Sequence, residues 1–63
     1  MRIEHLISIN GAILVVYYTS SNCYQYEIVF WDGSICQPDE LYKNADQALA
    51  VGIESIRIVI GYQ

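Results

Sequence analysis

The stretch that decides the fold is RIEHLISINGAILVVYY, residues 2–18. Two runs rich in isoleucine and valine, 2–9 and 12–18, flank the dipeptide Asn10-Gly11. Asparagine followed by glycine is among the strongest short signals for a two-residue hairpin, because a type I′ turn needs positive φ at both central positions. The stretch therefore predicts two antiparallel strands joined by a tight turn.

A second hairpin is predicted directly downstream. The segment YQYEIVFW (24–31) alternates between two faces, and Asp32-Gly33 forms the turn into a short strand over 34–37. Pro38 ends that strand, because proline has no N–H for a sheet ladder. The first forty residues thus predict an antiparallel β-meander of three to four strands.

The pattern changes to a helical period after residue 44. Asn44 is a good N-cap, Gln47 occupies the capping-box position, and Asp46 suits the helix dipole. These signals predict a helix over about 45–60, with Gly61 as its end. Small and apolar residues form one stripe along it at 100° per residue: Ala45, Ala48, Leu49, Gly52, Ile53, Ile56, Val59 and Ile60.

Length and composition place these elements in one small domain covering 1–63. A chain of 63 residues buries only about 60% of the surface that its unfolded form exposes, so folds of this size usually need a staple. The predicted fold class is α+β, with the antiparallel meander packed against one C-terminal helix. The helix is expected to cover the sheet face that carries Ile3, Ile7, Leu14, Val16, Tyr26, Ile28, Phe30 and Ile35.

The chain has more apolar residues than one covered face can use. Large contiguous apolar patches on a surface commonly mark interfaces, and Trp and Tyr dominate binding hot spots. The candidate interface combines the reverse face of the sheet with a second helical stripe: Val15, Tyr17, Val29, Trp31, Cys36, Val51, Ile58 and Tyr62. The simplest partner is a second copy, which predicts a homodimer, and a heterologous protein is the other possibility.

Other staples are poorly supported by the sequence. The opening Met-Arg-Ile-Glu-His does not resemble a secretory signal, and residues 12–18 are too short an apolar run for a membrane span. We therefore expect a cytoplasmic protein in which Cys23 and Cys36 are reduced. Two cysteines twelve residues apart and a distant His5 match no zinc spacing, so no metal or cofactor is expected.

The charge and the reactive residues exclude several functions. The net charge is −4 with only three basic residues, and without a basic cluster we expect no nucleic-acid binding. His5 is the only histidine, and no nucleophile stands beside a base in the sequence, so we expect no catalytic residues and no enzyme activity.

The order from Tyr24 onward is strand, Asp-Gly turn, strand, acidic loop and the segment NADQALAVGIESI. This order, with Asn44, Asp46, Ala48 and Leu49 at the helix start, resembles HicB-like antitoxins and short bacterial β-meander-plus-helix domains of unknown function. The resemblance implies an inhibitor whose acidic surface faces a small basic partner protein.

Three functional hypotheses follow. The first is a non-enzymatic, self-associating protein-interaction module. The second is the antitoxin-like inhibitor that the resemblance implies. The third is a binder of small apolar ligands, with a pocket between helix and sheet that Gly52 and Ala48 would open.

Overall fold

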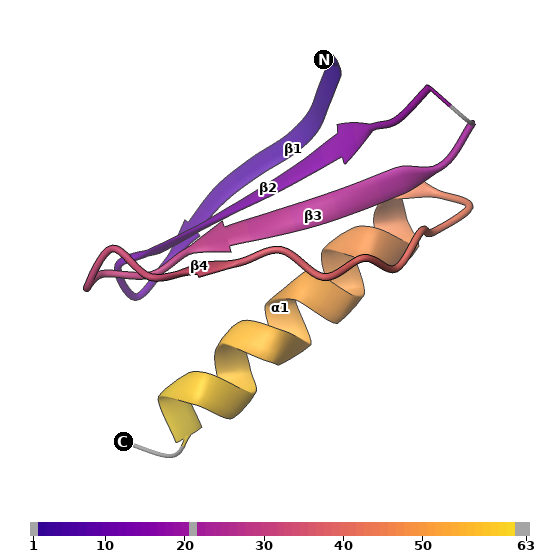
Figure 1. The fold of residues 1–63 in the computed structure, drawn as a ribbon. Coiled ribbons are helices and arrows are strands. Elements are labelled where there is room, and N and C mark those ends of the chain that lie inside the picture. The colour runs from indigo at the N-terminus through magenta and orange to yellow at the C-terminus, as the bar shows by residue number, and fades with distance from the viewer. Residues whose placement is uncertain (1, 21, 62–63) are drawn as a thin grey trace.

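The computed structural model describes residues 2–20 and 22–61. These residues form four strands and one helix, in the order β1 (Arg2–Ile9), β2 (Ala12–Tyr18), β3 (Tyr24–Val29), β4 (Ile35–Cys36) and α1 (Ala45–Gly61). The strands make one antiparallel sheet in chain order, and α1 lies across one of its faces (Figure 1). The predicted α+β arrangement is confirmed.

The turn between β1 and β2 has the predicted form. Asn10 and Gly11 adopt positive φ angles of 49° and 85°, and Ile9 pairs directly with Ala12 across the turn. Both central residues are therefore left-handed, as a type I′ turn requires. The turn sets the register of the hairpin from this end.

The register of β1 shifts near its start. His5 pairs with Val16 but Ile3 pairs with Tyr17, so Glu4 is an extra residue in β1. Because side chains alternate between faces, one extra residue moves everything before it to the other face. The prediction that Ile3 lies on the covered face is therefore wrong, and 51% of Ile3 is exposed.

The turn between β3 and β4 has three residues, 31–33, rather than the predicted two. The N–H of Phe30 donates to the carbonyl of Ser34 (2.8 Å), and Gly33 N–H donates to the carbonyl of Phe30 (2.9 Å). Gly33 has a φ of 87°, the left-handed conformation that three-residue hairpin loops need. The Ser34 hydroxyl and N–H both donate to Asp32 Oδ1, which lowers the pKa of the Asp32 carboxyl.

This longer turn shortens both strands and reverses the faces of β4. Val29 pairs with Ile35 and Ile28 pairs with Cys36, and β3 and β4 end at Val29 and Cys36 instead of residues 31 and 37. Cys36 therefore lies on the covered face and packs against the core, while 62% of Ile35 is exposed. The predictions for these two side chains are wrong because one added turn residue inverts a strand.

The helix begins where the sequence predicts. Asn44 Oδ1 accepts a hydrogen bond from the N–H of Gln47 (2.7 Å), and the Asn44 carbonyl accepts the first helical bond from Ala48 N–H (3.3 Å). The side chain thus satisfies one of the N–H groups that a helix start leaves unpaired.

Replacing this cap gives a first prediction. Asn44→Ala is expected to lower the free energy of unfolding by about 1 kcal/mol, because Gln47 N–H loses its acceptor. Urea unfolding followed by circular dichroism measures the change. Asn44→Ser is the control, since serine also caps helices and should lose much less. Equal stability of Asn44→Ala and the native chain would contradict the capping role.

The core lies between α1 and the central strands. Its buried members are hydrophobic and come from β2, β3, the segment before α1, and α1 itself: Ala12, Leu14, Val16, Tyr26, Ile28, Tyr42, Ala48 and Ile56. Helix and sheet approach each other closely at Gly52, where an added Cβ would lie 2.6 Å from Leu14 Cδ1. A residue larger than glycine at position 52 would therefore require Leu14 or the helix to move.

The predicted apolar stripe of α1 faces the sheet over most of its length. Val59 is the exception, with 38% of its surface exposed. Figure 1 gives the reason: the axis of α1 diverges from the sheet toward the C-terminal end, so its last turns lie farther from the strands. The prediction that Val59 belongs to the covered stripe is wrong.

The segment between β4 and α1 also contributes to the core. Tyr24 and Tyr42 exchange backbone hydrogen bonds of 2.7 and 2.8 Å, so this segment returns along β3. The Tyr42 ring is buried, and its hydroxyl donates to Glu40 Oε2 (3.3 Å). Burial, reinforced by the Glu40 charge, raises the pKa of Tyr42, so the hydroxyl keeps its proton.

Candidate functional site

The sheet face turned away from α1 carries neighbouring apolar side chains, and we call it the open face. Its apolar members pair across the strands and come from all four of them: Ile3, Leu6, Ile13, Val15, Tyr17, Val29 and Ile35. The predicted positions of Val15, Tyr17 and Val29 on this face are confirmed. Exposure is 44% for Ile13 and reaches 62% for Leu6 and Ile35.

Tyr17 is fixed in place near one end of the open face. Its hydroxyl donates to Gln25 Oε1 (3.4 Å) and accepts from Gln37 Nε2 (3.2 Å). These contacts join β2, β3 and the segment after β4. The two hydrogen bonds hold the Tyr17 ring in one orientation. Covering the ring with a partner would therefore cost little additional side-chain entropy.

Few charges interrupt the open face. Glu27 lies opposite Val15, and Ser8 and Gln25 lie opposite Ile13 and Tyr17. The apolar side chains thus form a group with one carboxylate among them. Large groups of exposed apolar side chains are uncommon on monomeric proteins. Where they occur, they commonly mark surfaces that bind other molecules.

Trp31 lies in the hairpin loop rather than in a strand. About half of it is exposed, and its ring packs edge-to-face on Phe30 with centroids 5.6 Å apart. Trp31 Cβ is 3.5 Å from the position that a Cβ on Gly11 would occupy. The tips of the two hairpins therefore meet at Trp31, at one end of the molecule.

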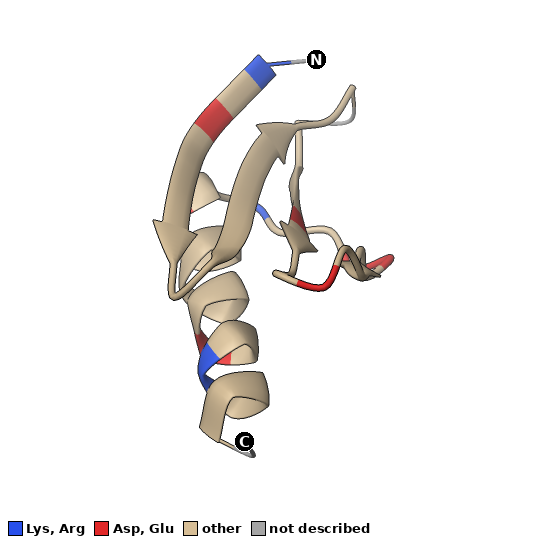
Figure 2. Ribbon diagram, turned by 90° about the vertical axis from the view of Figure 1, so that its left-hand side faces the viewer, with Lys and Arg blue, Asp and Glu red and all other residues tan. Residues whose placement is uncertain are grey.

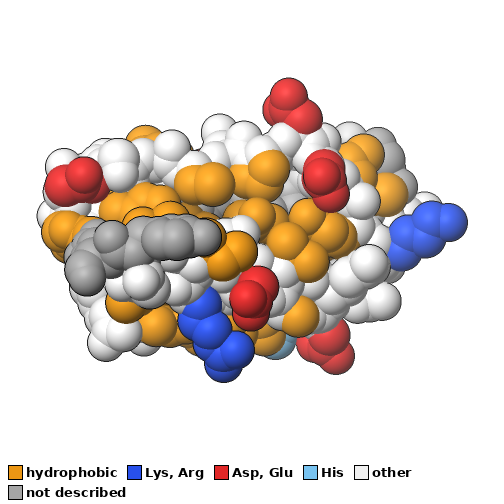
Figure 3. Space-filling model, turned by 90° about the horizontal axis from the view of Figure 1, so that it is seen from below, with side chains coloured by type: hydrophobic (Ala, Val, Ile, Leu, Met, Phe, Trp, Pro, Cys, Tyr) orange, Lys and Arg blue, Asp and Glu red, His pale blue; other side chains and the backbone are white. Residues whose placement is uncertain are grey.

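The second candidate surface is the outer side of α1. Val51 and Ile58 are exposed there, as predicted. Val59, which the sequence predicted on the covered stripe, is exposed as well. Figure 3 views the molecule from the side of α1 and shows hydrophobic side chains over much of its middle. Tyr62, the remaining member of the predicted stripe, lies outside the described residues.

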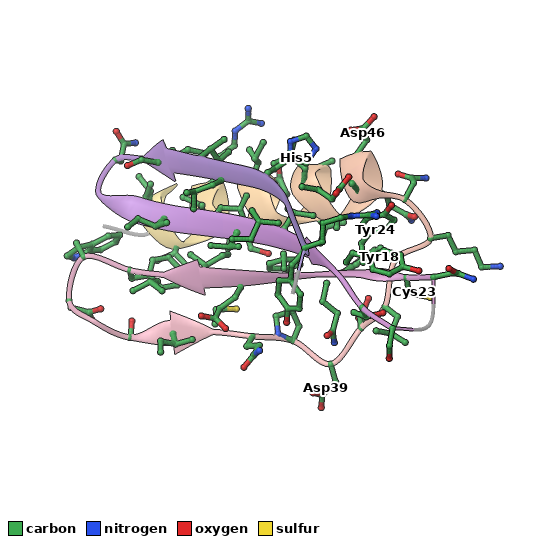
Figure 4. The ribbon with its side chains drawn as sticks, turned by 90° about the horizontal axis from the view of Figure 1, so that it is seen from above. His5, Tyr18, Cys23, Tyr24, Asp39 and Asp46 are labelled. Carbon is green, nitrogen blue, oxygen red and sulfur yellow. The ribbon has the colours of Figure 1, made fainter. Side chains whose placement is uncertain are left out.

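His5 contacts the start of the helix. Its Nε2 lies 3.6 Å from Asp46 Oδ1, which joins β1 to the first turn of α1. Figure 4 shows both side chains on one side of the molecule and Asp39 on the opposite side. The carboxylates of Asp39 and Asp46 are therefore not brought together, although they are close in the sequence.

The described residues do not assemble a metal site. Within 2–20 and 22–61, no three His, Cys, Asp or Glu side chains converge as metal ligands. Cys23 and Cys36 are both half-buried free thiols.

Aromatic side chains cluster at the end of the sheet opposite the hairpin tips. Tyr18 and Tyr24 pack edge-to-face with centroids 5.6 Å apart, and Arg2 Cζ lies 4.5 Å from the centre of the Tyr18 ring. Arg2 Nε also donates to Glu4 Oε2 at 2.9 Å. The guanidinium group of Arg2 therefore forms an ion pair with Glu4 and a cation–π contact with the Tyr18 ring.

The pocket that a small-ligand binder would need is filled. Leu14 occupies the space that Gly52 leaves open, and it is fully buried. No pocket was found among the residues that the structure describes.

Comparisons with protein-family models, with curated proteins and with solved structures found no match for this chain. In the described part of the chain, α1 does not combine the length and apolar character that crossing a bilayer requires. Among the strand residues that the structure describes, exposed large hydrophobic side chains gather on the open face.

Proposed function

We propose that this chain is a non-enzymatic protein-interaction module that associates with a second copy of itself through the open face. The exposure of Ile3, Leu6, Ile13 and Ile35 on one side of one sheet supports this proposal. Two such faces packed about a two-fold axis make a β-sandwich, in which apolar side chains interdigitate between sheets about 10 Å apart.

The expected strength of this contact is modest. Fully burying a large aliphatic side chain contributes about 1.5–3 kcal/mol, so eight half-exposed side chains from two copies contribute roughly 6–12 kcal/mol. Association costs about 4–15 kcal/mol in lost freedom and ordering. The two ranges overlap, so we expect association that depends on concentration in the micromolar range or above.

The proposed setting is the cytoplasm. The free thiols of Cys23 and Cys36 fit a reducing compartment, where unpaired cysteines persist. Self-association then supplies the additional burial that a chain of 63 residues needs.

Charging the open face tests the proposal. Ile13→Lys is expected to lower the weight-average mass in sedimentation equilibrium at hundreds of micromolar, because packing the two faces would remove the ammonium group from water and place it among apolar side chains. Ile13 is 44% exposed, so the substitution should leave the fold intact, which circular dichroism checks.

Ile58→Lys is the matched control. Ile58 is 51% exposed but lies on α1, away from the open face, so its substitution should leave the mass unchanged. A native chain that sediments as a monomer at hundreds of micromolar would refute self-association. Loss of mass in Ile58→Lys but not in Ile13→Lys would move the interface to the helix.

A further inference from the structure

The outer edge of β1 carries unused backbone groups. β1 is the first strand of the sheet order, with β2 on one side only. Antiparallel strands alternate between pairs that exchange two hydrogen bonds and pairs that exchange none. The pair beside a two-residue turn is bonded, here Ile9 with Ala12, so the N–H and C=O groups of Ser8 and Leu6 point away from β2.

The opposite edge of the sheet is protected. β4 has only two residues, and Pro38 follows it closely. Asp32, Asp39 and Glu40 are exposed near this edge. Short edge strands, proline and charge are the usual means by which proteins prevent an edge from pairing with another chain.

The β1 edge lacks these protections over His5–Ile9. The strand has eight residues and no proline, and its irregularity is confined to the region of Glu4. Leu6, at the centre of the edge, is 62% exposed. A regular strand edge with unpaired backbone groups and no proline is a template for strand addition.

Charge opposes a second copy less at the β1 edge than at the β4 edge. Each chain carries a net charge of −4, so two copies repel except where their facing surfaces are neutral. Along β1 the charges of Arg2 and Glu4 neutralise each other at 2.9 Å, which leaves the exposed Asp46 carboxylate, beside His5, near this edge. Figure 2 shows β1 with one basic and one acidic position near the N-terminus, on the side of the sheet away from the acidic segments after β3.

We propose that β1 pairs antiparallel with β1 of a second copy, about a two-fold axis at Ile7. Leu6 of one copy then faces Ser8 of the other in two bonded pairs, which use four N–H···O bonds. The two Ile7 side chains meet at the axis as a close β-branched pair. This inference names one contact of the self-association proposed above and rests on it.

The pairing is compatible with burial of the open face. A two-fold axis normal to the sheet keeps both helices on one side and places the two open faces side by side on the other. A pair of copies joined at the β1 edge therefore buries its open faces by packing against a second such pair. The edge contact and the face contact use different groups, so substituting Ile13 disrupts the second and leaves the first.

Amide hydrogen exchange measured by NMR tests the edge contact directly. At near-millimolar concentration the Leu6 and Ser8 amides are expected to exchange at least about tenfold more slowly than at low micromolar concentration. The Ile7 amide is the internal control, since its bond to β2 protects it at both concentrations. The same experiment on Ile13→Lys isolates the edge, and protection of Leu6 and Ser8 should persist there.

The outcomes separate the two proposals. A native chain that is monomeric at hundreds of micromolar overturns both. An oligomer in which Leu6 and Ser8 exchange as fast as in dilute solution overturns the edge pairing alone. An oligomer in which these amides are protected, and in which Ile13→Lys leaves the mass unchanged, overturns the open-face contact and supports the edge.

Discussion

Leu14→Ala is expected to lower the free energy of unfolding by about 2–5 kcal/mol. Leu14 is fully buried between β2 and α1, and its methyl groups fill the space beside Gly52. Removing them costs the transfer free energy of the lost carbons and leaves a cavity. Domains are stable by about 0.05–0.15 kcal/mol per residue, or roughly 3–9 kcal/mol here, so this loss is a large fraction of the total stability.

Urea unfolding of Leu14→Ala, followed by circular dichroism, measures this loss. Ile35→Ala is the control, because it also shortens an aliphatic strand residue but at a position that is 62% exposed. Its unfolding midpoint, measured at a concentration where the chain is monomeric, should change little. A loss for Leu14→Ala no larger than that for Ile35→Ala would contradict the placement of the core.

Gly52→Val is expected to destabilise the chain by about 1–3 kcal/mol through overpacking. An added Cβ would lie 2.6 Å from Leu14 Cδ1 and 3.0 Å from Cδ2, so Leu14 or the helix must move. Intrinsic propensity opposes this expectation, because glycine is the less favourable helix former of the two. A destabilised variant would therefore show that the contact outweighs helix propensity.

Two comparisons sharpen this second test. Gly61→Val is the control within α1, since an added Cβ there meets no atom within 4 Å. The double variant Leu14→Ala/Gly52→Val should be more stable than the sum of the single losses predicts, because valine fills part of the space that Leu14 vacates. Additive losses would show that the two residues do not share one space.

The same close packing limits what the chain can do. Leu14 fills the interior beside Gly52, and both of the contacts that we propose lie on the outside of the molecule. The open face and the β1 edge are adjacent there and share Leu6. Both proposed contacts involve backbone or apolar groups, which suits a partner recognised by shape and strand pairing.

Local chemistry was sufficient to predict most of the fold. The Asn10-Gly11 turn, the alternating pattern of β2 and β3, and the cap at Asn44 each depend on residues close together in the sequence. The open-face positions of Val15, Tyr17 and Val29 followed from the period of two. These features were predictable because turn and cap preferences act over only a few residues.

The wrong predictions of sheet face are at positions where one extra residue in a turn or strand reverses the face on which a side chain lies. The three-residue loop at 31–33 moved Cys36 to the covered face and Ile35 to the open face, and the extra residue at Glu4 did the same for Ile3. The glycine at position 33 also fits the longer loop, because the third residue of a three-residue hairpin loop takes the positive φ that Gly33 has in the structure.

The sequence by itself predicted the elements of this protein: three to four strands, one capped helix, and an excess of apolar side chains over what one face can bury. Only the tertiary structure decided which side chains form the open face, that Leu14 fills the space above Gly52, and that β1 is the unprotected edge. The physical reason is that element formation is local, whereas register, close packing and edge exposure depend on residues brought together from distant positions.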